Sequence, residues 1–187
     1  MKIALFSILI AATAFAQEHD GKVIPSPDKK LSIKHQWAND DPTGEAYTHL
    51  ATLQRGNDTP WAFSDKGRAI VFSWSPDSRY LLFGVVLPGR DMDLYFLDTR
   101  AKQPKEQNLN LSKIERKVEA SLPERASGAF ASRSQIDFEK IQWTSASECK
   151  LRYFYQFDRK GGDAELTLDL AEKTPALKIT KIIALAE

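Results

Sequence analysis

Residues 79–98 place the strongest limit on what this chain can fold into. They form two apolar runs joined by a Pro-Gly-Arg-Asp turn, which is typical of a β-hairpin. A turn centred between Gly89 and Arg90 predicts that Phe83 lies opposite Phe96. The other face of that hairpin is apolar too, so the sheet needs cover on both faces and we expect it to pack between two neighbouring sheets. The apolar residues of this second face are Tyr80, Leu82, Val86, Tyr95 and Leu97.

An earlier hairpin is predicted within residues 31–54, and it is polar on one face. The register that pairs Trp37 with Tyr47 also pairs His35 with His49, and it gathers the apolar side chains on the same side. Such alternation is typical of an antiparallel sheet that faces water on one side. The opposite face carries Ser32, Lys34, Gln36, Thr48 and Thr52, with Leu50 as the exception.

A third hairpin is predicted within residues 149–170, and it alternates in the same way. Gly161 and Gly162 fit a two-residue hairpin turn, which places Tyr155 opposite Leu168. The fully apolar hairpin therefore lies in the chain between two hairpins that each face water on one side. Neighbouring blades of a propeller have this relationship.

The tripeptide Ser-Pro-Asp occurs twice, at residues 26–28 and 75–77, each time ahead of an apolar run. Proline presets its own φ and aspartate bonds back to its backbone, so both copies favour a tight turn between strands. Trp-Thr-Ser at residues 143–145 stands where the second copy has Trp-Ser-Pro. We predict an all-β fold of about three antiparallel meanders, propeller-blade-like and open or incomplete. The expected strands are 22–24, 31–38, 47–54, 60–63, 69–74, 79–87, 93–98, 107–111, 136–143, 149–157, 164–170 and 177–185.

One segment between the second and third meanders has helical periodicity. Ser112 and Glu115 form a capping box, and apolar residues recur at every fourth position from Ile114. We predict one short helix near residues 112–122 that covers a sheet edge. The small and polar residues 124–134 indicate a loop after it.

Residues 1–16 have the pattern of a secretory signal peptide. Lys2 precedes an apolar run, and Ala-Phe-Ala at residues 14–16 forms a small-x-small cleavage site. Cleavage before Gln17 would leave a single β-rich domain, residues 17–187, in the periplasm or outside the cell. The apolar run is shorter than the roughly 20 residues that a membrane-spanning helix needs, and no later segment predicts a span in the mature chain.

Charge and cysteine content argue against several classes of function. The chain has 26 Lys and Arg against 25 Asp and Glu, a formal net charge of +1, and removal of Lys2 brings this to zero. A neutral chain lacks the basic surface that nucleic-acid binding needs. Cys149 is the single cysteine, so no disulfide can form within the chain. Its apolar neighbours predict an inert, buried thiol.

The stretch WSPDSRYLLFG, followed by DLYFLDTR, resembles the TolB-type (WD-like) β-propeller repeat, which also occurs in propeller domains of prolyl-oligopeptidase-like enzymes. Residues 26–28 match it in part and Trp143 in outline, so the resemblance covers about half of the chain. It implies binding through loops and a central channel, and it supplies no catalytic residues. A closed propeller typically needs about four or more blades. With three, either a second chain completes the ring or the meanders form an open stack, sandwich or barrel.

His35 and His49 are the strongest candidates for a binding site, with Trp37 and Tyr47 on the same predicted face. Two imidazoles at that spacing could share a metal, and the loop at residues 40–45 offers carboxylates. No third ligand is fixed by the spacing, so a hydrogen-bonded pair within an apolar face is favoured. We predict a ligand-binding role for these four residues, with no metal, no cofactor and no catalytic residue.

The sequence favours a binding protein over an enzyme, because it has neither a Gly-x-Ser-x-Gly nucleophile motif nor a Gly-rich phosphate loop. We predict an exported, β-rich binding module whose partner is an envelope protein, a peptide or a glycan. The loops at residues 39–46, 88–92 and 158–163 would form its binding surface. Two alternatives stay open: a small cell-wall or peptide hydrolase that uses carboxylates or the His35/His49 pair, and a structural subunit that completes a ring as a homodimer.

Overall fold

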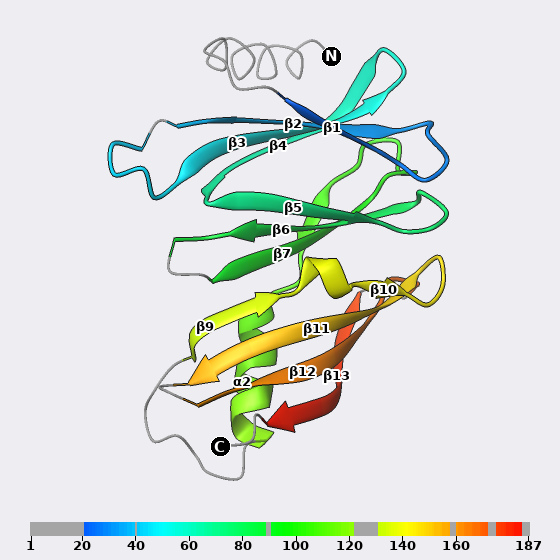
Figure 1. The fold of residues 1–187 in the computed structure, drawn as a ribbon. Coiled ribbons are helices and arrows are strands. Elements are labelled where there is room, and N and C mark those ends of the chain that lie inside the picture. Colours follow the sequence, from blue (N-terminus) through cyan, green and yellow to red (C-terminus); the bar gives the residue numbers. More distant parts are fainter. Residues whose placement is uncertain are drawn as a thin grey trace.

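Three antiparallel sheets stack on one another and make up most of the molecule (Figure 1). We call them layer 1, layer 2 and layer 3, in chain order. The structure is a computed structural model, and it describes residues 21–39, 41–88, 91–121, 131–157, 160–171 and 175–184. The predicted signal peptide, residues 1–16, lies outside the described residues.

Each layer is a meander whose strands pair with their neighbours in the sequence, with one exception in layer 3. The predicted all-β fold of three antiparallel meanders is therefore confirmed. Layer 1 contains β1 (Lys22–Pro25), β2 (Ser32–Ala38), β3 (Tyr47–Arg55) and β4 (Asp58–Gly67). Layer 2 contains β5 (Ala69–Trp74), β6 (Tyr80–Val86), β7 (Met92–Asp98) and β8 (Glu106–Asn108). Layer 3 contains β10 (Gln142–Trp143), β11 (Glu148–Phe157), β12 (Lys160–Asp169) and β13 (Ala176–Ala184), and β9 (Ala131–Ile136) pairs with β11 beside β10.

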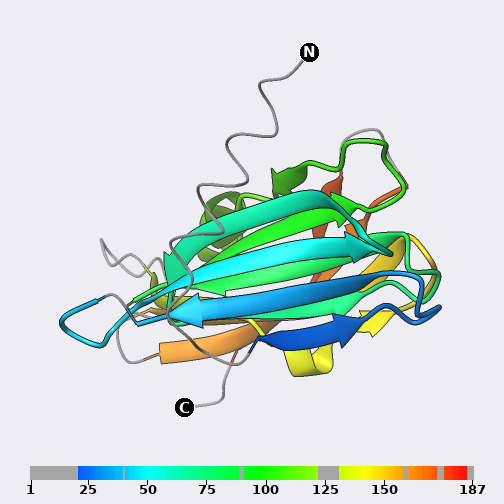
Figure 2. The same ribbon diagram turned by 90° about the horizontal axis from the view of Figure 1, so that it is seen from above.

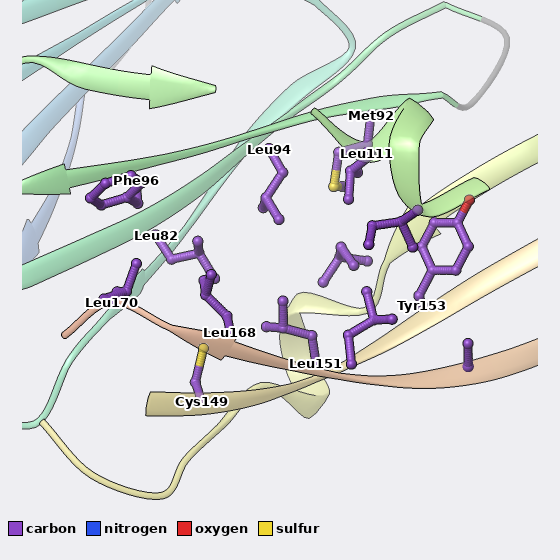
Figure 3. Packing of buried hydrophobic residues seen from close by; sticks show 14 of the residues in the cluster. Leu82, Met92, Leu94, Phe96, Leu111, Cys149, Leu151, Tyr153, Leu168 and Leu170 are labelled. Carbon is purple, nitrogen blue, oxygen red and sulfur yellow. The ribbon is translucent and has the colours of Figure 1, made fainter. Parts of the chain in front are cut away.

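Layer 2 is buried on both faces, as its sequence predicts. Successive side chains of a strand point to opposite faces, and β6 is buried at Leu81 and at Leu82 alike. One hydrophobic core joins layer 2 to layer 1, and a second joins it to layer 3 (Figure 3). The first core contains Ile33, Leu53, Trp61, Leu81, Phe83, Val85 and Leu97. The second contains Tyr80, Leu82, Leu94, Phe96, Leu151, Leu166 and Leu168.

The predicted helix is present as α2 (Leu111–Ser121). Its apolar side chains Leu111, Ile114 and Val118 are buried in the core between layers 2 and 3. Figure 1 shows α2 lying against layer 3. No helix in the described ranges combines the length and the apolar character that a membrane span requires.

The register of the layer 2 hairpin differs from the predicted one by a single residue. Phe83 lies opposite Tyr95, and Phe96 lies opposite Leu82. Because the strands meet at Val86 and Met92, the connection has an odd number of residues, 87–91, instead of the expected even turn. A slip of one residue moves every side chain of a strand to the other face. The sequence could not exclude it, since β7 is apolar at both odd and even positions.

The register in layer 1 also differs from the predicted one. Trp37 lies opposite His49 instead of Tyr47, and His35 lies opposite Ala51. This shift of two residues leaves every side chain on its expected face, because the side-chain period of a strand is two. The two histidines are consequently diagonal neighbours rather than a directly opposed pair.

In layer 3 the predicted Gly-Gly turn is wrong. Gly161 and Gly162 belong to β12, and Gly162 lies opposite Tyr155. The last pair of the hairpin is Phe157 with Lys160, which places the two-residue connection three positions earlier. The side chains still lie on the predicted faces, because the pairing shifts by an even number of residues. Tyr155 lies opposite Gly162 instead of Leu168, a shift of six. Several even registers bury the same apolar residues here, so the pattern alone could not choose among them.

The expected strand at residues 136–143 is interrupted, and part of the expected loop at 124–134 is a strand, β9. The interruption is a 3₁₀ turn, η1 (Phe138–Lys140), in which the backbone N–H of Glu139 donates to the carboxylate of the N-cap residue Asp137. The turn directs Phe138 toward layer 2 at Gly84. A Cβ atom there would lie 2.8 Å from the Phe138 ring, so only glycine leaves room for it.

The outward faces of the stack are polar. Lys34 and Lys66 on layer 1 are exposed, as are Lys150 and Glu165 on layer 3. Figure 2, seen from above, shows layer 1 lying over the rest of the stack. Within the described residues, the three sheets form an open stack that does not close into a ring. Polar outer faces are what such a stack needs where it meets water.

Two tryptophans at equivalent positions of the repeat differ in their hydrogen bonding. Trp143 Nε1–H donates to the hydroxyl of Ser73 in the preceding layer, at 3.0 Å. Trp74 occupies the matching position in layer 2, but the residue that matches Ser73 in layer 1 is Ile24, which has no hydroxyl. Trp74 Nε1 is buried and has no hydrogen-bond partner among the described residues.

This difference predicts unequal costs for the same substitution. Trp143→Phe removes a hydrogen bond and leaves the Ser73 hydroxyl without its donor, whereas Trp74→Phe removes a buried donor that has no partner. We expect Trp143→Phe to lower the free energy of unfolding by about 1 kcal/mol more than Trp74→Phe does. Urea denaturation of the two variants measures this, and equal costs would contradict the assignment.

Candidate functional site

His35 and His49 form a buried hydrogen-bonded pair between layers 1 and 2. Nε2 of His35 lies 3.0 Å from Nδ1 of His49, and Nε2 of His49 lies 3.1 Å from the carbonyl oxygen of Gly67. Because a carbonyl oxygen only accepts, His49 carries its proton on Nε2. His49 Nδ1 then accepts the N–H of His35. This chain of donors fixes the tautomer of both rings and ties β2 to β3 and to the end of β4.

Aromatic rings surround the pair. The centroid of Trp37 lies 5.3 Å from that of His35, and the ring of Tyr47 lies 6.2 Å from that of His49. All four residues of the predicted site are therefore brought together, the histidines buried and the other two half-buried. Phe72 of layer 2 contacts His35 edge-on at 5.5 Å. That contact could not be predicted from the sequence, because it depends on how the layers pack.

Burial keeps both imidazoles neutral. Desolvation lowers the pKa of His35 to about 4, and the neighbouring His49 and Lys22 act in the same direction. Desolvation also lowers the pKa of His49, opposed by its bond to Gly67 and by the charge of Asp65 on the adjacent strand. At neutral pH the pair is thus an uncharged part of the interface between layers.

One carboxylate of the loop that was expected to offer metal ligands, that of Asp41, bonds within the loop itself. Asp41 accepts hydrogen bonds from the backbone N–H of Thr43 at 2.9 Å and of Ala46 at 3.0 Å. The neighbouring Asp40 lies outside the described residues. Within the described part of the chain, no group of three or more His, Cys, Asp or Glu side chains is placed to hold a metal ion. Among the described residues the two histidines bond to each other and to Gly67, and their ligand-binding role stays a prediction.

Cys149 is fully buried in the core between layers 2 and 3 (Figure 3). Desolvation raises the pKa of its thiol to about 12. A thiol with so high a pKa is a poor nucleophile at neutral pH, in agreement with the inert thiol predicted from the sequence.

A cleft that sequence reasoning missed lies where layers 2 and 3 meet. Its volume is about 600 Å³, within the range of small-ligand sites. Layer 2 contributes the ends of β6 and β7, and the segment β9–η1 forms its other side. The apolar residues that line the cleft are Val71, Val86, Met92, Ile136, Phe138 and Phe154.

Charged residues form the rim of this cleft. Arg152 is paired with Asp163, and Lys140 Nζ lies 2.7 Å from the carboxylate of Asp137. The hydrogen bond and charge of Lys140 hold the pKa of Asp137 below its usual value. Glu139 is exposed at the same rim. These residues could not be assembled from the sequence, since the 3₁₀ turn that positions most of them has no clear sequence signature.

The sequence matches no protein-family model, and no curated protein matches it.

The histidine pair predicts a loss of stability in mild acid. A histidine whose pKa is lowered in the folded protein is protonated more readily in the unfolded chain. Its contribution is complete above the unfolded value of about 6.5 and is lost as pH falls from there toward about 4. For His35 this shift corresponds to roughly 3 kcal/mol.

Urea denaturation at pH values from 7 down to 4 measures this effect. His35→Gln and His49→Gln should both be less stable than the parent at neutral pH and should show a smaller loss in acid. His19→Gln is the matched control, and it should keep the full pH dependence. A parent protein equally stable at pH 7 and pH 4.5 would refute the buried neutral pair.

Proposed function

We propose that this protein is an exported binding module that holds an apolar side chain of an envelope peptide or protein in the cleft between layers 2 and 3. The cleft itself carries the proposal, because it combines an apolar floor with a charged rim. Ligand sites in proteins commonly pair an apolar lining with a few placed polar groups. Phe138 and Phe154 supply aromatic surface for such a contact.

The rim favours a peptide as the partner. It offers cationic donors on Lys140 and Arg152, whose side chains are more than 40 % exposed, and carboxylate acceptors on Asp137 and Asp163. A peptide backbone carries both N–H donors and carbonyl acceptors beside its side chains. It could therefore bond to groups of both signs while one apolar side chain enters the cleft.

The cleft adjoins two of the three loops that are expected from the sequence to form the binding surface. Val86 ends β6 and Met92 begins β7, so the cleft lies at the hairpin that contains the predicted loop 88–92. Asp163, in the predicted loop 158–163, belongs to β12 and also lines the cleft. In Figure 1 the ends of β2, β6 and β12 that adjoin these loops lie on the same side of the stack.

The charges of the cleft support binding more than hydrolysis. A general acid needs a raised pKa and a free proton, whereas the hydrogen bond to Lys140 lowers the pKa of Asp137. Asp163 is held by Arg152. The ring-closing homodimer is not favoured either, because another blade would have to cover exposed residues such as Lys34 or Lys150. Export, the TolB-type resemblance and the periplasmic or secreted location belong to this proposal as expectations from the sequence.

Panning a random peptide library against the folded chain tests the proposal. We expect peptides with a recurring apolar residue, whose affinity fluorescence polarisation then measures. Phe154→Ala should weaken their binding about tenfold or more, since it removes an aromatic anchor. Phe63→Ala is the matched control, because Phe63 is half-buried between layers 1 and 2, away from the cleft.

Two results would overturn the proposal. One is that no peptide binds, or that only cell-wall oligosaccharides do. The other is that Phe154→Ala and Phe63→Ala weaken binding equally, which would mean that loss of stability and not loss of the contact explains the effect.

A further inference from the structure

A second cleft lies at the opposite end of layer 2, between the two Ser-Pro-Asp turns. Its volume is about 460 Å³, and it is formed by layers 1 and 2 together. The turns contribute Asp28 and Asp77, and the end of β3 contributes Arg55. The segment after β7 closes the cleft with Thr99 and Arg100. None of these residues belongs to the cleft between layers 2 and 3.

The two turns have the same internal hydrogen bonds, and they are joined to each other. Ser26 Oγ donates to Asp28 at 2.7 Å, and Ser75 Oγ donates to Asp77 at 2.8 Å. The backbone N–H of Asp28 donates to the hydroxyl of Ser78 in the second turn, at 3.1 Å. This bond holds the two sides of the cleft at a fixed separation.

Both carboxylates of the cleft are already occupied by donors. Asp28 accepts from Ser26 and from the backbone N–H of Lys30 at 3.1 Å. Asp77 accepts from Ser75 and, through its other oxygen, from Arg100 at 2.9 Å. Neither aspartate therefore has to be neutralised by an added cation.

Positive charge is in excess in the cleft. The lining carries three cationic side chains, Lys30, Arg55 and Arg100, against the two carboxylates. Arg55 is half-buried, and its Nη2 donates to the backbone carbonyl of Thr99 at 2.5 Å. No carboxylate of the described residues forms an ion pair with it. A guanidinium group has five N–H donors in a planar fork, so Arg55 keeps donors that can serve a ligand.

We propose that this cleft binds an oxyanion, a phosphate or carboxylate group, held by the guanidinium of Arg55. Bonding of Arg55 to Thr99 fixes its position before a ligand arrives, which suits the two parallel hydrogen bonds that arginine makes to such groups. Lys30 and Arg100 line the same cleft and add positive charge to it. The ligand class follows from charge and donor geometry, and it is independent of the peptide proposed for the other cleft.

Titration with inorganic phosphate and, separately, with acetate tests the site, at ionic strength held constant with chloride. The backbone amide signals of Ser78 and Thr99 should shift in a saturable way in nuclear magnetic resonance spectra of the full chain. Shifts with phosphate alone would assign the site to phosphate groups, and shifts with both would assign it to oxyanions in general. Absence of saturable shifts with either anion would overturn the proposal.

Substitutions separate a site at Arg55 from general charge attraction. Arg55→Gln should weaken anion binding about tenfold or more, because it removes the charge-assisted hydrogen bonds. Arg68→Gln is the matched control: it removes the same charge from an exposed residue at the other end of β5, and it should bind as the parent does. Arg100→Gln, at a largely exposed residue, should also weaken binding and covers the case in which Arg55→Gln does not fold. Equal affinity of the parent and either cleft variant would refute the site.

Discussion

Burial of layer 2 on both faces is the constraint on which the rest of the structure depends. Leu81 and Leu82 are adjacent in β6, point to opposite sides and are both fully buried. Burial of a leucine side chain contributes about 1.5–3 kcal/mol, so exposing either face of β6 would cost several times that amount over its length. Layers 1 and 3 supply the cover, and each can face water on its own outer side. The order of the three sheets follows from this requirement.

The repeated turns attach layers 1 and 2 to one another, and the larger cleft lies where the repeat changes. Layers 1 and 2 share the Ser-Pro-Asp turn, and their two copies are bonded through Asp28 and Ser78. The third unit has Thr144 and Ser145 instead, whose backbone N–H groups both point to the carbonyl of Glu148. There the first strand is divided into β9 and β10 by η1, and the larger cleft opens beside it. Departures from local regularity are often found at functional sites.

The sequence was sufficient to predict what depends on the alternation of side chains, and insufficient for what depends on register. Which residues of β2, β3, β11 and β12 face the core followed from a period of two, and an even slip in register does not change it. The slip in layer 2 is odd, and the pattern does not reveal it because β7 is apolar on both faces. The register error in layer 1 was even, so His35 and His49 are still on one face and in contact, as predicted.

Neither cleft could be predicted from the alternation of apolar and polar residues. The larger one depends on Phe138, which enters layer 2 only because Gly84 has no side chain. The smaller one depends on Arg55 reaching Thr99, 44 positions away in the chain. Neither contact leaves a periodic signal, because each joins two different layers at a single point. The sequence nevertheless contained one usable sign, the repeated turn, both copies of which line the smaller cleft.

Thiol labelling of single cysteines tests the burial of layer 2 most directly. Leu81→Cys and Leu82→Cys, each made in the Cys149→Ala background, place a thiol on either face of β6. In the folded protein both should react far more slowly than Lys34→Cys on the outer face of layer 1. If either of the two β6 thiols reacts as fast as the Lys34→Cys thiol, layer 2 has a face in water, and the stacked arrangement with its clefts is incorrect.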